Sequence, residues 1–268
     1  MSNSSVLKNL TGVSKILKYS IILPYYKRGN HLYNTLITFK CHYNKYKYEV
    51  IIVEDYKNCK DEKEHQVLCD IVDKFNDDIV ILVVSSPLQD CHNPAPLYNM
   101  GVNEAFGEFL IISSPECFHP TDILSKLDKE FDIDKNCYIV CACEDVVGIG
   151  GKGKITRFEN FSEFAVTHRL WFQHSKFNNR GFHFCSAILK DKYLEIGGFD
   201  NNFSLGVAYD DNDFRDNIIY HNIPIKLRDD LVVCHMSHEY IPVPNYEKLV
   251  EINKGYYFNK LNKRNIKL

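Results

Sequence analysis

The sequence has no excess of basic charge, no long apolar run and no clear targeting segment. Its formal net charge is -3 over 268 residues, which gives no argument for a nucleic-acid partner. No segment approaches the roughly 20 apolar residues that a transmembrane helix needs. Residues 1–18 are polar with only short apolar pieces, unlike a secretory signal. We therefore expect a protein with no membrane span and no nucleic-acid partner.

The sequence also lacks paired cysteine motifs. Its ten cysteines are scattered, and no two of them have the Cys-x-x-Cys spacing of a structural zinc site. Cys141, Cys185 and Cys234 lie in apolar runs, where cysteine packs as a small hydrophobic side chain. Reduced, buried thiols are typical of a reducing compartment, so we expect a cytoplasmic protein.

Two common nucleotide-binding signatures are missing as well. Pro24, Tyr25 and Tyr26 follow the first predicted strand, where a nicotinamide dehydrogenase would have Gly-x-Gly-x-x-Gly. The glycine-rich segment 148–154 is not followed by Gly-Lys-Ser or Gly-Lys-Thr, so we interpret it as a mobile loop and not as a phosphate cradle. These absences argue against a dehydrogenase.

The sequence does contain short β-branched runs that alternate with helical stretches. Residues 19–24 and 48–53 have the apolar pattern of buried parallel strands, and residues 31–39 between them have helical spacing. The alternation continues, which predicts an α/β fold with a mostly parallel central sheet flanked by helices. The other expected helices are 62–75, 97–106 and 246–268, and the other expected strands are 79–84, 109–112, 138–143 and 231–236.

An acidic stretch late in the chain is the most informative part of the sequence. Gly197 and Gly198 permit a tight turn, because both signs of φ are open to glycine. Asp210, Asp211 and Asp213 then precede an amphipathic run. Like charges this close raise each other's pKa unless a cation or a substrate hydroxyl uses them, which points to a functional site. An acidic helix N-terminus would explain the same residues.

Taken in order, these segments resemble a GT-A glycosyltransferase, similar to the family 2 enzymes, with a C-terminal acidic motif like that of the β-1,4-galactosyltransferase group. The five matching segments are Ser-Ile-Ile-Leu-Pro-Tyr-Tyr-Lys-Arg (20–28), Glu-Val-Ile-Ile-Val-Glu-Asp (49–55), Tyr-Asn-Met-Gly-Val-Asn-Glu-Ala (98–105), Gly-Glu-Phe-Leu-Ile-Ile-Ser-Ser-Pro-Glu (107–116) and Gly-Gly-Phe-Asp through the acidic stretch (197–213).

The resemblance covers about residues 19–240 and implies one GT-A domain over residues 1–268. In that domain, residues 19–117 would form the nucleotide-sugar-binding half and residues 118–240 the acceptor and catalytic half. Residues 241–268 would form a C-terminal tail.

The resemblance implies transfer of a sugar from a nucleotide-diphosphate sugar to a glycan or another hydroxyl acceptor, with inversion. Asp211 would be the general base and Asp210 would bind acceptor hydroxyls. Lys27 or Arg28 would stabilise the diphosphate leaving group. The residues implied to bind the nucleotide sugar are Pro24, Tyr26, Arg28, Glu54, Asp55 and Asn99.

The resemblance also implies a divalent cation, Mn²⁺ or Mg²⁺, but the usual Asp-x-Asp of the family reads Ser114-Pro115-Glu116 here. Glu116 is then the one carboxylate left at that strand end, with His235 and His238 as the implied further metal ligands. An imidazole ligand favours Mn²⁺ over Mg²⁺. The weakened motif leaves an alternative open: a GT-A protein that binds a nucleotide or glycan without turnover.

Overall fold

A nine-stranded mixed sheet forms the centre of the protein. The computed structural model describes residues 17–147, 155–158, 167–239 and 241–264, so the glycine-rich segment 148–154 lies outside the described residues. The strands are β1 (Tyr19–Tyr25), β2 (Tyr48–Glu54), β3 (Val80–Ser85), β4 (Phe109–Ser113), β5 (Cys117–Phe118), β6 (Tyr138–Val147), β7 (Thr167–Gln173), β8 (Cys185–Leu189) and β9 (Ile225–Met236). Their order in the sheet is β3-β2-β1-β4-β8-β6-β9-β5, and β7 pairs with β6.

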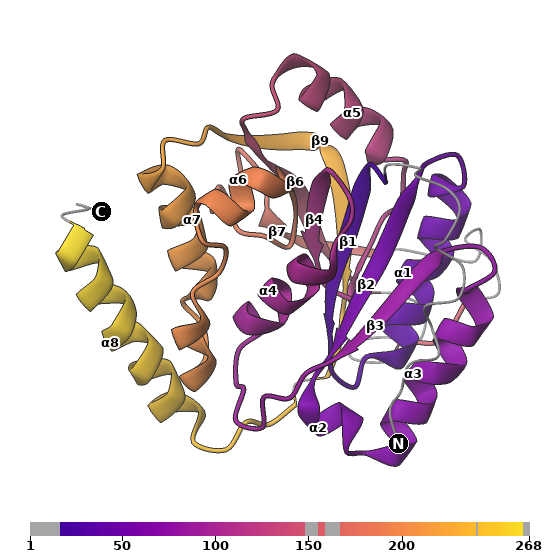
Figure 1. Ribbon diagram of the computed structural model, residues 1–268, viewed down its shortest axis with the longest axis horizontal. Helices are drawn as coiled ribbons and strands as arrows, with labels where there is room; N and C mark the ends of the chain where they lie inside the picture. The colour runs from indigo at the N-terminus through magenta and orange to yellow at the C-terminus, as the bar shows by residue number, and fades with distance from the viewer. Residues whose placement is uncertain (1–16, 148–154, 159–166, 240, 265–268) are drawn as a thin grey trace.

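Helices cover both faces of the sheet (Figure 1). They are α1 (Gly29–Tyr43), α2 (Tyr56–Cys59), α3 (Glu62–Phe75), α4 (Ala95–Glu104), α5 (Leu124–Ile133), α6 (Lys190–Glu195), α7 (Asp210–Tyr220) and α8 (Tyr246–Arg264), with a 3₁₀ helix, η2, at Asn201–Leu205. One core joins the sheet to α1, α3 and α5 through residues such as Leu36, Leu68 and Leu127. A second core joins the other face to α4, α6, α7 and α8. Among the described residues, none of these helices has the length and apolar character to cross a membrane.

The strands β1 to β4 form a parallel part of the sheet, as the sequence predicts. β1 lies between β2 and β4 and is parallel to both, and β3 is parallel to β2. Pro24 is tolerated in this central strand because the β4 ladder ends at Ile22, so the missing N–H of proline leaves no β4 partner unbonded. The carboxyl ends of β1, β2 and β4 therefore lie at one edge of the sheet.

The second half of the sheet departs from a simple parallel pattern. β8 is inserted between β4 and β6 and is antiparallel to both, and β7 forms an antiparallel pair with β6. The sequence predicted neither strand, because residues 155–182 show no clear period and 182–189 read only as an apolar run. Ser113, the last residue of β4, pairs with Cys185, the first residue of β8. The chain before β8 thus arrives at the same edge as the end of β4.

Candidate active site

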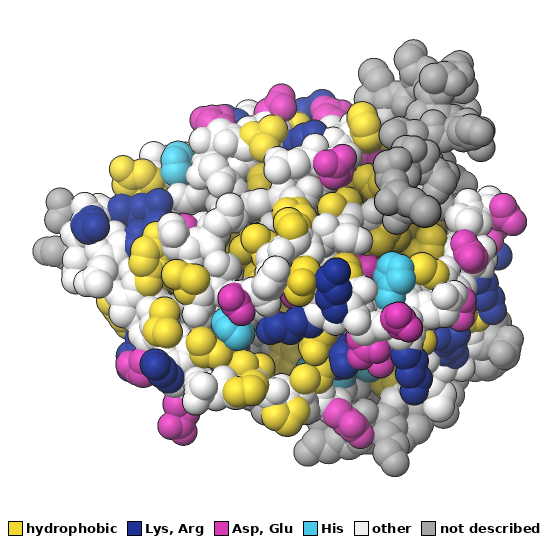
Figure 2. Space-filling view, turned by 60° about the horizontal axis from the view of Figure 1, so that its bottom comes forward, with side chains coloured by type: hydrophobic (Ala, Val, Ile, Leu, Met, Phe, Trp, Pro, Cys, Tyr) yellow, Lys and Arg dark blue, Asp and Glu magenta, His cyan; other side chains and the backbone are white. Residues whose placement is uncertain are grey.

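Two adjoining cavities open at the carboxyl edge of the parallel strands, which is where α/β sheets bind ligands. The larger has a volume of about 600 Å³ and the smaller of about 350 Å³. Figure 2 brings the bottom of Figure 1 forward, and on this face acidic, basic and histidine side chains gather among apolar ones. The residues that line both cavities, and so join them, are His92, Asn93, Pro94, Tyr98, Ser114 and Glu116.

Four of the six predicted nucleotide-sugar residues line the larger cavity. Pro24, Tyr26 and Arg28 come from the end of β1 and the turn after it, and Asp55 follows β2 directly. The segment 241–244, between β9 and α8, lines the same cavity with two prolines, an isoleucine and a valine. The cavity therefore combines an apolar, aromatic surface with two acids, Asp55 and Glu116, and the guanidinium group of Arg28.

Asp55 is held in place by the start of α2. Its carboxylate accepts a hydrogen bond of 2.8 Å from the backbone N–H of Lys57 and so caps this short helix. Burial raises the pKa of Asp55, and the hydrogen bond from Lys57 opposes that rise. The arrangement fixes a carboxyl group at the cavity wall, where it is able to accept hydrogen bonds from a ligand.

Glu54, the residue before Asp55, lies on the other side of the chain. Its side chain is fully buried, accepts a hydrogen bond of 2.6 Å from Asn58 Nδ2 and lies 3.0 Å from His65 Nδ1. Glu54 is not among the described residues that line either cavity. These contacts argue against the predicted contact between Glu54 and a nucleotide, because the carboxylate is directed into the protein.

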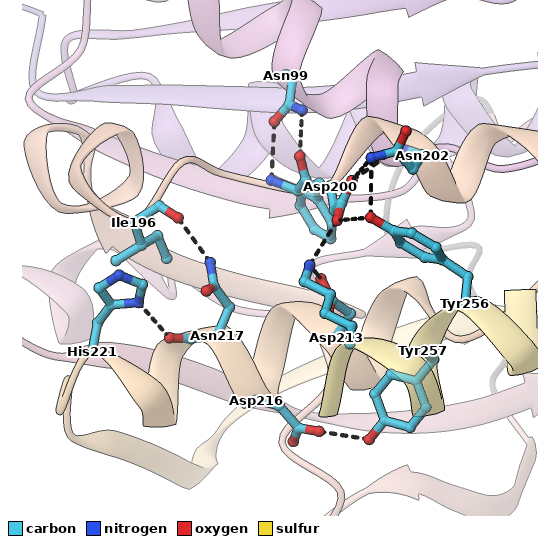
Figure 3. A network of polar contacts seen from close by, with 12 residues as sticks. Asn99, Ile196, Asp200, Asn202, Asp213, Asp216, Asn217, His221, Tyr256 and Tyr257 are labelled. Atoms are coloured by element: carbon cyan, nitrogen blue, oxygen red, sulfur yellow. Dashed lines mark hydrogen bonds and ion pairs between the residues drawn. The ribbon is translucent and has the colours of Figure 1, made fainter. Parts of the chain in front are cut away.

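Asn99 is held by hydrogen bonds to residues of the protein core and not by groups at a cavity. Its Nδ2 donates to the backbone oxygen of Phe199 at 2.7 Å (Figure 3), and its Oδ1 accepts from the hydroxyl of Tyr193 at 2.6 Å. Asn99 is also absent from the described lining of both cavities. It joins α4 to the turn at Gly197 and Gly198, whose φ angles of 81° and 63° confirm the tight turn that the sequence predicts.

Arg28 and Glu116 form an ion pair where the two cavities meet. Arg28 Nε lies 2.8 Å from Glu116 Oε1, and the same guanidinium lies 3.1 Å from His238 Nδ1. Burial alone would raise the pKa of Glu116, but Arg28 and then His235 outweigh it and hold that pKa below its usual value. Glu116 is therefore a carboxylate that already has a cationic partner.

The histidines predicted to bind metal lie beside this pair. His235 and His238 line the smaller cavity with Glu116, and their rings are 5.3 Å apart. His235 Nδ1 lies 3.6 Å from Asp145 Oδ1. Within the described chain, the ligand atoms of Glu116, His235 and His238 do not converge within 4.8 Å of one another as a metal-binding group. The residues present therefore do not fit a divalent cation at the strand end where the resemblance would put it.

Asp210 and Asp211 begin α7 and face the smaller cavity. Asn93 Nδ2 donates to Asp210 Oδ1 at 2.8 Å, and His183 Nδ1 lies 2.9 Å from Asp211 Oδ1. Burial, and after it the neighbouring Asp211, raise the pKa of Asp210 to about 6. Burial opposes a charge on His183, but Asp211 outweighs it and raises the pKa of that imidazole.

The third acid of this stretch is directed elsewhere. Asp213 Oδ2 accepts from Lys260 Nζ of α8 at 2.7 Å, and the same ammonium donates to Asp200 Oδ2 at 2.7 Å (Figure 3). The predicted acidic cluster thus divides into two acids at a cavity and one that fastens α8. All three lie in the first helical turn, where the macrodipole also favours them.

Sequence reasoning missed three residues of this site: Asn93, Tyr98 and His183. Tyr98 lines both cavities and donates to the backbone oxygen of Ser113 at 3.2 Å. His183 precedes β8 within Phe-His-Phe, and a single polar residue in an aromatic run is the one local signal that was available. Its position at the site depends on the pairing of β8 with β4, which the sequence did not predict.

The chain resembles solved structures in fold although its sequence is distant from them. No protein-family model matches the sequence, and no curated protein sequence matches it. Staphylococcus aureus TarS 1–349 in complex with UDP-GlcNAc has a TM-score of 0.64 at 14% identity, covering 92% of this chain and 67% of that one. The mannosyltransferase PcManGT from Pyrobaculum calidifontis, in complex with GDP-Man and Mn²⁺, has a TM-score of 0.56 at 15% identity, covering 90% of this chain and 61% of that one.

A third structure, GalNAc-T7 with UDP, GalNAc and Mn²⁺, has a TM-score of 0.58 at 14% identity, covering 94% of this chain and 52% of that one. The chain thus spans between about half and two thirds of the length of these three proteins. They are GT-A glycosyltransferases, and their mixed α/β core with flanking helices is the one described above. The protein has the GT-A fold.

Proposed function

We propose that the protein transfers a sugar from a nucleotide-diphosphate sugar to a hydroxyl acceptor. The observation that carries this proposal is the pair of joined cavities at the carboxyl edge of the sheet. The larger is lined by Asp55, Glu116 and Arg28 together with apolar residues, and the smaller has the adjacent carboxyl groups of Asp210 and Asp211. Structural neighbours of this fold have UDP-GlcNAc or GDP-Man bound, which supports a nucleotide-sugar ligand.

The larger cavity suits the donor. In this proposal Pro24 and Tyr26 offer surface to the nucleoside, and Asp55 accepts a hydrogen bond from it. Arg28 stabilises the negative charge that develops on the diphosphate, because a guanidinium group binds phosphate oxygens bidentately. Lys27 is less suited to this task, since its Nζ is paired with Asp61 at 3.0 Å.

The smaller cavity suits the acceptor. We propose an inverting displacement in which the acceptor oxygen forms a bond to the anomeric carbon of the sugar. The bond from that carbon to the diphosphate breaks, and its electron pair leaves with the diphosphate. Asp211, whose side chain is 38% exposed, takes the hydroxyl proton as general base. Asp210 is buried and hydrogen-bonded to Asn93, so it orients the acceptor hydroxyl.

A divalent cation, Mn²⁺ or Mg²⁺, belongs to the proposal because two structural neighbours have Mn²⁺ bound. Such an ion supplies positive charge to phosphate or hydroxyl oxygens. The ion pair with Arg28 argues against Glu116 as its chief ligand, since a metal would have to displace a guanidinium partner at 2.8 Å.

Binding without turnover is the second candidate. It is favoured by Ser114-Pro115-Glu116, which keeps one carboxylate where the family has two. A screen of UDP and GDP sugars for hydrolysis and transfer, with and without Mn²⁺, separates the two candidates. Turnover that Asp211→Asn abolishes supports the enzyme. Saturable nucleotide binding with no turnover of any donor supports the binding protein.

A further inference from the structure

We propose that His183, Asp210 and Asp211 form a binding site for one divalent cation, apart from the Ser114–Glu116 strand end. The three residues come from two segments, the chain just before β8 and the first turn of α7. The role of the ion in sugar transfer rests on the proposed function. The binding of the ion is argued from the three side chains alone.

The geometry of the three side chains fits a single ion. One imidazole nitrogen and one oxygen from each carboxylate all lie within 4.8 Å of one another, and His183 Nδ1 lies 2.9 Å from Asp211 Oδ1. Ligand atoms that surround one ion at bond lengths of about 2.0–2.2 Å lie at such separations from each other. Small side-chain movements would therefore bring all three atoms to the ion.

The charge of the site is not compensated by lysine or arginine. In the part of the chain that the structure describes, Asp211 is paired only with His183, and Asp210 has the neutral amide of Asn93 as its partner. The other acids nearby already have cationic partners, which include Lys260 for Asp213 and Arg28 for Glu116. Two adjacent carboxylates with no lysine or arginine partner favour a divalent ion from solution.

His183 gives an independent indication of a ligand. Its side chain is 7% exposed and lies against the rings of Tyr98 and Phe199 at 5.1 and 4.7 Å. Its Nδ1 is buried and, among the described residues, has no partner in hydrogen-bond geometry, although Asp211 is within ion-pair distance. A buried imidazole nitrogen that lies 2.9 Å from an acid, outside hydrogen-bond geometry, is a donor atom suited to a metal.

The donor set indicates which ions the site prefers. One imidazole nitrogen and two carboxylate oxygens suit Mn²⁺, Co²⁺ or Zn²⁺ better than Mg²⁺ or Ca²⁺, which prefer oxygen ligands only. Three protein ligands leave coordination positions open toward the smaller cavity, as in metal sites that exchange water for substrate. In the proposed function, those positions would take an acceptor hydroxyl.

Mn²⁺ titration of the full chain, without nucleotide or acceptor, tests the proposal by electron paramagnetic resonance and calorimetry. We expect one bound Mn²⁺ with nitrogen coupling from one imidazole. His183→Gln and Asp210→Asn should weaken the affinity by at least about tenfold. Glu116→Gln and Asp213→Asn are the matched controls, because each removes a nearby carboxylate that is already paired, and both should keep the affinity of the parent protein.

Two results would overturn the proposal: no binding of Mn²⁺ or Zn²⁺ to the parent chain at millimolar concentration, or binding that Glu116→Gln abolishes and His183→Gln leaves intact. The nitrogen coupling is measured on the unmodified chain, so its absence counts against the site even if a variant fails to fold. Sugar transfer is assayed separately. Sugar transfer without Mn²⁺ binding would support the proposed function and exclude this metal site. Mn²⁺ binding without sugar transfer would support the metal site and count against the proposed function.

Discussion

Arg28 Nε and Glu116 Oε1 lie 2.8 Å apart and join the ends of β1 and β4. This ion pair stands at the strand end where the resemblance implies a divalent cation held by Glu116, with His235 and His238 as further ligands. Both side chains are 14% exposed, so the ion pair is partly shielded from water. A diphosphate that enters the larger cavity has to compete with Glu116 for the guanidinium group.

Arg28→Met should therefore weaken donor use more than Arg28→Lys. Lysine keeps the charge but loses the fork that binds two phosphate oxygens, so Arg28→Lys should raise the KM for the donor by about tenfold. Arg28→Met removes the charge too and should raise it further. Initial rates over a range of donor concentrations give both values, with Lys27→Met as the control. An unchanged KM in Arg28→Met would exclude Arg28 from the donor site.

Asp211→Asn should reduce the rate of transfer by roughly two to four powers of ten, the usual contribution of one general base. Donor affinity should change little, because the amide keeps the shape of the side chain and binding to the ground state is not altered. Single-turnover rates and calorimetric titration of a nucleotide measure the two quantities. Asp213→Asn is the control on the same helix. A variant at Asp211 with nearly the parent rate would assign the base to another residue.

Gly198→Ala should destabilise the fold more than Gly197→Ala. Both glycines have positive φ, so each alanine costs about 1–2 kcal/mol of backbone strain. A Cβ at Gly198 would lie 2.5 Å from Tyr193 Cε1, whereas a Cβ at Gly197 meets nothing within 4 Å. Crowding therefore adds about 1–3 kcal/mol at Gly198 alone. Urea unfolding of the two variants measures the difference, and equal losses would contradict the packing argument.

Lys260→Met should reduce the free energy of unfolding by about 3–5 kcal/mol at pH 7, because it leaves two carboxylates without their cation. Burial raises the pKa of Asp200, but Lys260 and Asn202 outweigh it and hold that pKa below its usual value of 3.8. A depressed pKa contributes stability above the usual value, and this contribution is lost as the pH falls through the folded-state pKa.

Burial raises the pKa of Asp213, the other partner of Lys260, and the loss of Lys260 would raise it further. The stability difference between Lys260→Met and the parent should consequently begin to shrink above the usual carboxyl pKa and continue to shrink as the pH falls through the depressed pKa of Asp200. Urea unfolding at neutral and acidic pH checks this. Lys254→Met is a suitable control, since Lys254 lies on the same helix and forms a surface pair with Glu251, in which the two side chains are 44% and 67% exposed. A difference that stays constant with pH would show that Lys260 stabilises the helix by packing and not by charge.

The parallel half of the sheet was predictable because its signals are local. The β-branched runs of β1, β2 and β4 specify buried strands, and their carboxyl ends specify an edge at which polar residues collect. The alternation of side chains along a strand also explains why Glu54 and Asp55 face different surroundings. Successive side chains of an extended chain point to opposite sides. Of the neighbours Glu54 and Asp55, only one side chain could therefore face the cavity.

The acceptor side of the site was harder to predict because it depends on pairing between distant segments. β8 is antiparallel to β4, and Ser113 lies opposite Cys185. No periodicity in the sequence predicts that register. The position of His183 beside Asp211 could therefore not be predicted from the sequence alone. The roles of Asp210 and Asp213 were equally hidden, since the difference between them lies in the position of Lys260, far along the chain.

The insertion of β8 also bears on which substitutions the site tolerates. Strand ends within the first 116 residues line much of the larger cavity, while the chain before β8 and the start of α7 supply His183, Asp210 and Asp211 to the smaller one. Where the structure describes it, the stretch between β6 and β8 forms no strand pair with β1 or β2. We therefore expect substitutions just before β8 to alter the smaller cavity while the strands that carry the larger one keep their register.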